Sequence, residues 1–124
     1  MDKWIILGCA GALGTVSRYA VSTWAYQALG AKFPYGTLIV NLLGCFLMGF
    51  LASVSHERLL TPAVRLLLVV GFLGAFTTFS SFILESSQLI KQGQSVLAFL
   101  NVLLSVALGF VVFYIGVLLA EQMG

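Results

Sequence analysis

The run from Gly71 to Phe82 combines glycines, hydroxyls and aromatic rings inside an otherwise apolar segment. It reads Gly-Phe-Leu-Gly-Ala-Phe-Thr-Thr-Phe-Ser-Ser-Phe, with two glycines and four hydroxyls. In the middle of a membrane span such residues let the backbone leave helical geometry, and a break frees carbonyls that must be buried, meet water or coordinate an ion. The alternative is an unbroken helix whose hydroxyls bond back to preceding carbonyls. The composition of the run leaves both interpretations open.

Two aromatic rings in this run are placed to share one helical face. Phe79 and Phe82 are three residues apart, and Thr78, Ser80 and Ser81 are interleaved with them. An aromatic ring has a positive edge that attracts anions while it excludes water. Rings at this spacing often serve packing alone, but rings alternating with hydroxyl donors suit a small anion.

Two further polar residues lie within apolar runs. Asn41 offers two amide donors that are costly to leave unpaired, and its residue type favours a hydrogen bond between helices over a pore contact. Arg18 either extends its guanidinium to the membrane surface or draws anions into a vestibule. Its position alone favours the surface.

The remaining polar residues are ambiguous one by one. Glu85 could cap a pathway or pair with Lys91, while Asn101 and Ser105, one helical turn apart, form a polar stripe. His56 falls in an expected turn and is interpreted as a solvated loop residue.

Composition excludes a soluble fold. Of the 124 residues, 60% are hydrophobic and 8% are charged, whereas soluble domains carry about 25% charge. A spanning helix needs about 20 apolar residues, so the chain supplies about four spans in a single domain, 1–124. One histidine and scattered acids offer no Ser-His-Asp set, acid pair or metal cluster, so an enzyme is the least favoured class.

The charges and prolines divide the chain into spans. Pro34 and Pro62 stand at span starts, where a missing N–H costs nothing, and the polar stretch around His56 and Arg58 marks a turn. Runs this apolar, without alternation, exclude strands and predict an all-α membrane protein. Small residues such as Gly8, Gly14 and Gly44 are interpreted as helix packing. The expected spans are about 4–29, 35–55, 63–90 and 95–120.

The positive charges give no preferred orientation. Arg18 lies about 14 residues, or roughly 21 Å, into the first span and is counted at its far end. Each side of the membrane then carries three of the six cations, so the bias is zero. We therefore expect an antiparallel, dual-topology homodimer. The two sets are Lys3, Arg58 and Arg65 on one side, and Arg18, Lys32 and Lys91 on the other.

Taken in order, three motifs resemble the Fluc (CrcB) family of fluoride ion channels, and the likeness covers nearly the whole chain. The motifs are Gly11-Ala-Leu-Gly-Thr-Val-Ser-Arg-Tyr19, Pro34-Tyr-Gly-Thr-Leu-Ile-Val-Asn-Leu-Leu-Gly44, and the run from Gly71 to Phe82 with Glu85 following. The third is highly specific. The chain departs from the family pattern at Ala75, Ser81, Ile83 and Leu84.

The resemblance implies a dual-topology homodimer of four-helix subunits, with a broken third helix and two oppositely oriented fluoride pores. It also implies a structural sodium ion at the dimer axis, held by backbone carbonyls of Gly74 and Thr77. Carbonyl oxygens suit such a hard cation, and the twofold axis doubles two ligands to four. The vestibule arginine of the family matches Arg18.

The same resemblance implies a fluoride-selective channel for passive export in a bacterial cell membrane, which confers fluoride resistance. Its expected partners are fluoride, sodium, the lipid bilayer and a second copy. The expected pore residues are Asn41, Thr78, Phe79, Ser80, Ser81 and Phe82, with Glu85, Asn101 and Ser105 as a polar track.

Two other membrane functions remain as alternatives. A small multidrug exporter also has four short helices and an antiparallel dimer, but its proton coupling requires an acid in the first helix, where this chain has Arg18. A non-transporting assembly subunit would need the glycine-rich faces alone, and would leave the hydroxyls around two phenylalanines unexplained.

Overall fold

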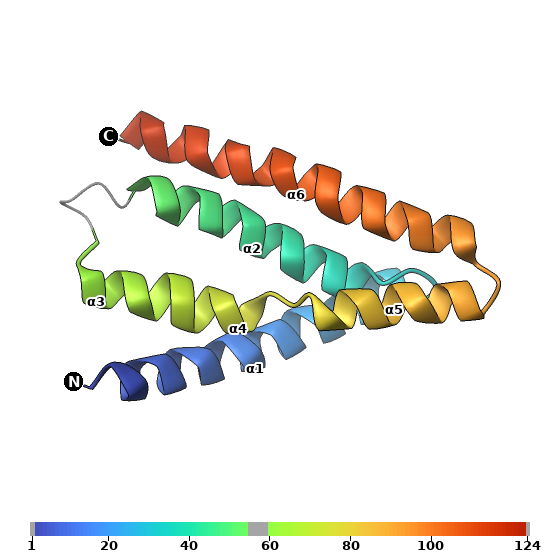
Figure 1. Ribbon diagram of the computed structural model, residues 1–124, viewed down its shortest axis with the longest axis horizontal. Helices are drawn as coiled ribbons and strands as arrows, with labels where there is room; N and C mark the ends of the chain where they lie inside the picture. The colour runs from blue at the N-terminus through green and yellow to red at the C-terminus, as the bar shows by residue number, and fades with distance from the viewer. Residues whose placement is uncertain (1, 55–59, 124) are drawn as a thin grey trace.

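Four long helical segments run side by side in the computed structural model, which describes residues 2–54 and 60–123 (Figure 1). The described residues contain no strand, so the prediction of an all-α chain is confirmed for them. Four segments are long and apolar enough to cross a membrane, as expected. The helices are α1 (Lys3–Leu29), α2 (Tyr35–Val54), α3 (Pro62–Arg65), the π-helix η1 (Leu66–Leu73), α4 (Gly74–Phe76), α5 (Ser80–Lys91) and α6 (Ser95–Met123).

Caps and tight turns set the ends of these helices. The Asp2 carboxylate accepts a hydrogen bond from the Trp4 N–H at 3.1 Å, and the Thr61 hydroxyl accepts from the Val64 N–H at 3.3 Å, with Pro62 in the first turn of α3. Gly93, at φ 76°, makes the tight turn between α5 and α6. The turn predicted at His56 and Arg58 lies outside the described residues. Consecutive long segments run antiparallel (Figure 1).

The third segment, Pro62–Lys91, is assembled from four consecutive helical pieces. Its first half is widened into the π-helix η1, a rare geometry that is frequent near functional sites. Three residues, 77–79, separate α4 from α5, and Thr77 has extended backbone angles (φ −85°, ψ 158°). In Figure 1 these residues form the thin stretch near the middle of the segment.

Glycines let the helices approach one another closely. A Cβ atom at Gly49 would overlap the Phe113 carbonyl oxygen on α6, and one at Gly116 would overlap the Phe46 carbonyl oxygen on α2. Gly14 lies in the same way against the Phe72 carbonyl of η1. The interpretation as packing sites is therefore confirmed for Gly14, and for Gly44, whose Cβ position meets the Thr77 side chain. Gly8 differs, because no atom of the described residues lies within 4 Å of its Cβ position.

A small apolar cluster anchors the third segment to its neighbours. Val40 on α2, Leu73 at the end of η1 and Phe76 on α4 are each almost completely buried together. Phe76 is the last helical residue before the interruption. The backbone therefore leaves the helix directly beside the best-packed part of the fold.

Arg18 lies in the middle of its segment, and its expected place near the far end is therefore wrong. α1 ends at Leu29, as expected for this span, and the Arg18 side chain turns inward toward α4. Lys3 and Arg65 belong to one end of the bundle, and Lys32 and Lys91 to the other. The ends of α1 and α6 that carry the chain termini share one end in Figure 1.

Packing between α2 and α6 gives a stability prediction. Gly49→Ala should destabilise the protein by about 2 kcal/mol, because the added methyl group meets rigid backbone. Chemical unfolding in detergent, followed by circular dichroism, measures the change. Gly8→Ala is the matched control, since its methyl group meets open space, and should change stability by less than about 0.5 kcal/mol. Equal effects of the two substitutions would contradict this account of the helix contact.

Candidate functional site

The interruption of the third segment is held by the amide of Asn41 on α2. The Asn41 Oδ1 accepts a hydrogen bond from the Thr78 N–H, and its Nδ2 donates to the Thr78 carbonyl, each at 2.8 Å. The Thr78 hydroxyl in turn accepts from the Ser81 N–H at 3.3 Å, at the start of α5. Side chains thus replace the helical pairing that residue 78 lacks. Of the two interpretations of Asn41 from the sequence, this contact favours the hydrogen bond between helices.

Arg18 reaches the same interruption from α1. Its Nε donates a hydrogen bond to the Ala75 carbonyl at 3.0 Å, and the side chain is partly buried. A cavity of about 190 Å³ lies beside it, with both hydroxyls and charges in its walls. Besides Arg18, the cavity is lined by Thr15, Tyr19, Ser22, Thr37, Val40, Thr78, Ser81 and Glu85. A guanidinium in this cavity is placed to attract an anion.

The Gly74 and Thr77 carbonyls are among the backbone groups that lose their helical partners between α4 and α5. In a continuous α-helix the Gly74 carbonyl would accept from the Thr78 N–H, and the Thr77 carbonyl from the Ser81 N–H. Those two N–H groups donate instead to Asn41 Oδ1 and to the Thr78 hydroxyl. Gly74 is also exposed on the surface of the chain. Released carbonyl oxygens are the ligand type that a hard cation takes, so this pair fits a sodium ion.

Phe79 and Phe82 lie next to each other but differ in exposure. Their ring centroids are 5.8 Å apart with the planes tilted by 49°. Phe82 is 7% exposed, whereas Phe79 is 74% exposed. Both line a mainly apolar cavity of about 360 Å³. Its other walls are Asn41, Gly44, Cys45, Met48, Thr77, Thr78, Ser105, Val106 and Phe113.

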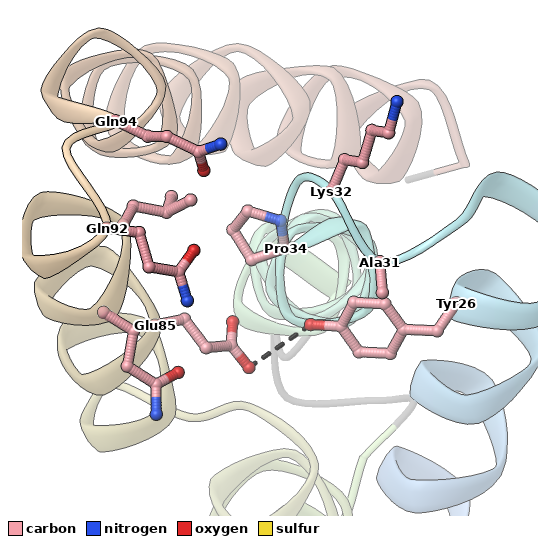
Figure 2. Close-up of a pocket in the computed structure, with 9 residues that line it drawn as sticks. Tyr26, Ala31, Lys32, Pro34, Glu85, Gln92 and Gln94 are labelled. Atoms are coloured by element: carbon pink, nitrogen blue, oxygen red, sulfur yellow. Dashed lines mark hydrogen bonds between the residues drawn. The ribbon is translucent and has the colours of Figure 1, made fainter.

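Glu85 stands at the boundary of a third, wider cavity. Its Oε1 accepts hydrogen bonds from the Thr37 hydroxyl at 2.8 Å and from the Tyr26 hydroxyl at 3.3 Å, so its bonds are to α2 and α1 rather than to Lys91. Its Oε2 is buried and has no hydrogen-bond partner among the described residues. Figure 2 shows the Tyr26–Glu85 bond among the residues that line this cavity of about 520 Å³. The rest of its lining is Ala31, Lys32, Pro34, Gln88, Leu89, Gln92 and Gln94.

Neighbouring cavities share a wall residue, so the three lie next to one another. Glu85 lines both the 520 Å³ and the 190 Å³ cavities, and Thr78 lines both the 190 Å³ and the 360 Å³ cavities. The residues predicted from the sequence fall into two groups, one on each side of Thr78. Thr78 joins Arg18, Ser81 and Glu85 on one side and the phenylalanine pair on the other, whereas Ser80 is exposed and lines none of the three.

A buried polar ladder connects α5 to α6. The Asn101 Nδ2 donates to the Ser86 hydroxyl at 2.9 Å, and that hydroxyl donates to the Phe82 carbonyl at 2.8 Å. The Ser105 hydroxyl donates to Asn101 Oδ1 at 3.5 Å. Asn101 is 1% exposed, so it ties two helices together, while Ser105 lines the cavity of Phe79 and Phe82.

Three polar residues at these contacts were missed by the sequence reasoning. Thr37 and Tyr26 hold Glu85, and Ser86 links Asn101 to the backbone of Phe82. Ser86 lies four residues after Phe82, and a hydroxyl in an apolar helix commonly bonds to that carbonyl. The Thr37 and Tyr26 contacts join segments 48 and 59 residues apart in the chain. No local sequence pattern predicts contacts between residues so far apart in the chain.

Comparison with known proteins gives one consistent family. Residues 5–117 match the family of CrcB-like proteins, Camphor Resistance (CrcB). A fluoride-specific ion channel FluC from Magnetococcus marinus is 49% identical over 119 residues, which cover 95% of each chain. One from Dehalococcoides mccartyi is 46% identical over 126 residues, covering 98% of this chain and 94% of the relative. One from Geobacter sp. is 40% identical over 124 residues, covering 99% and 100%. The chain therefore belongs to the CrcB-like protein family.

Proposed function

We propose that this chain forms a fluoride-selective channel that lets fluoride leave the cell passively. Relatives named fluoride-specific ion channel match this chain over nearly its full length. The structural observation that carries the proposal is that three cavities lie next to one another and share Glu85 and Thr78 as wall residues. A path of this kind would run past the interruption of the third segment, where hydroxyls, an amide and aromatic rings lie beside the charged Arg18 and Glu85.

Fluoride passage requires groups that replace a tightly held hydration shell. In the proposed path Arg18 attracts the anion into the middle cavity, and Thr78 and Ser81 offer hydroxyl groups there. Phe82 and Phe79 then present ring edges in the next cavity. A narrow lining of uncharged donors favours the smallest halide, because a larger anion gains less from each donor and fits less well.

The interruption at residues 77–79 is, in this proposal, the mid-membrane break of the third helix, and the working unit is an antiparallel homodimer of dual topology. The exposure of Phe79 and Gly74 in one chain supports a second chain at this surface. Two copies in opposite orientation give two parallel pores.

A sodium ion at the axis of this dimer is the proposed cofactor. The carbonyls of Gly74 and Thr77 would hold it, and their release from helical pairing supports this assignment. The ion supplies fixed positive charge and joins the two subunits without being transported. Its ligands are backbone atoms, so the chain needs no acidic side chain there.

Family membership decides between the proposal and its alternatives. An exporter coupled to protons requires an acid within the first span, but α1 has none and carries Arg18 at its middle. An assembly subunit would have no use for a polar path. Transport rather than catalysis is therefore the function of this membrane protein.

The aromatic pair gives the first functional prediction. Phe82→Ile should reduce fluoride release from proteoliposomes by about tenfold or more, because it removes the ring edge that faces the anion. A fluoride electrode measures the release. Phe99→Ile, at an exposed site on α6 away from the three cavities, should release fluoride like the wild type. Unimpaired release by Phe82→Ile and Phe79→Ile would remove the rings from the mechanism.

The proposed sodium site gives the second prediction. Exchange of sodium for N-methylglucamine during purification should lower the thermal midpoint of the dimer, since a ligand of the folded dimer stabilises it by mass action. Differential scanning fluorimetry measures the midpoint, and the salts are compared at equal ionic strength. The same midpoint in both salts would argue against a cation between the subunits.

A further inference from the structure

The amide of Asn41 competes with the backbone for one hydrogen-bond donor. The Thr78 N–H would pair with the Gly74 carbonyl if α4 continued as an α-helix, but it donates to Asn41 Oδ1 at 2.8 Å. The donor cannot serve both acceptors well. Whether the Gly74 carbonyl is free to face another ligand therefore depends on the side chain at position 41.

The surrounding contacts favour the bond from the Thr78 N–H to Asn41 over a bond to the Gly74 carbonyl. Its Nδ2 also holds the Thr78 carbonyl at 2.8 Å, so the amide grips both polar groups of one residue. Gly44, one helical turn further along α2, has Thr77 Cγ2 where its own Cβ would lie. One face of α2 thus fixes two successive residues of the interruption, while Arg18 holds the Ala75 carbonyl from α1.

We propose that Asn41 is a positioning residue for the cation site: by holding the Thr78 N–H, it keeps the Gly74 carbonyl available as a ligand. This inference rests on the proposed function and its sodium ion. It assigns Asn41 a role distinct from contact with the permeating anion. Loss of the amide frees the Thr78 N–H to pair with the Gly74 carbonyl, which then binds the cation less well.

A sodium titration of thermal stability tests this role. The half-maximal sodium concentration for stabilisation of the purified dimer should rise about tenfold in Asn41→Ala. Ser86→Ala is the matched control, because it also removes two hydrogen bonds within the bundle but lies away from the interruption. It should lower the thermal midpoint without moving the half-maximal sodium concentration. An unmoved sodium concentration in Asn41→Ala, or an equal shift in Ser86→Ala, would overturn the proposal.

A conservative substitution separates positioning from pore contact. Asn41→Asp retains an oxygen that accepts from the Thr78 N–H, so its half-maximal sodium concentration should stay within about threefold of the wild type. Its fluoride release should fall, because a carboxylate repels the anion. A sodium shift as large as that of Asn41→Ala would contradict the competition for the N–H. Asn41→Ser, too short to hold both groups, replaces Asn41→Ala if that variant does not fold.

Fluoride release by the wild type distinguishes the two levels of the proposal. If wild-type proteoliposomes release no fluoride, the proposed function fails, while the sodium titration still reports on Asn41. If the wild-type midpoint does not respond to sodium, the positioning role is overturned even when fluoride is released. If the wild type releases fluoride and its midpoint responds to sodium, and the variants behave as stated, both the channel function and the positioning role of Asn41 are supported.

Discussion

The fold depends on how the backbone of residues 77–79, between α4 and α5, finds its hydrogen-bond partners. Lipid offers no hydrogen bonds, so each N–H and C=O released at residues 77–79 needs a protein partner, water or a bound ion. Asn41 supplies an acceptor and a donor to Thr78, and Arg18 supplies a donor to the Ala75 carbonyl. The polar residues within α1 and α2 are thus explained first as substitutes for helical pairing, and the proposed ion path runs along them.

Close packing makes this arrangement possible. The interruption follows directly after the buried cluster of Val40, Leu73 and Phe76, so the chain leaves helical geometry at a fixed point. Gly44 leaves room for the Thr77 side chain, and the glycine contacts between α2 and α6 hold α2 in place. A shift of α2 by a fraction of a helical turn would separate Asn41 from Thr78. The packing of α2 therefore also fixes the position of the polar groups along the proposed ion path.

The sequence was sufficient for the four spans and the all-α class, because hydropathy and prolines mark them locally, whereas the composition around Thr78 left both a continuous and an interrupted helix open. It misplaced Arg18, since charge counting cannot show that the side chain turns inward to a carbonyl on α4. It also missed the bonds of Tyr26 and Thr37 to Glu85, which join distant segments. Pairings of this kind depend on tertiary packing and have no local pattern.

The central claim is that uncharged donors around the interruption conduct fluoride in preference to other anions. A planar bilayer with fluoride on one side and chloride on the other, at equal concentration, measures this preference as a reversal potential. The account predicts a large potential of the sign set by fluoride permeation. A reversal potential of about zero, as expected for a pore that passes both halides equally, would contradict it.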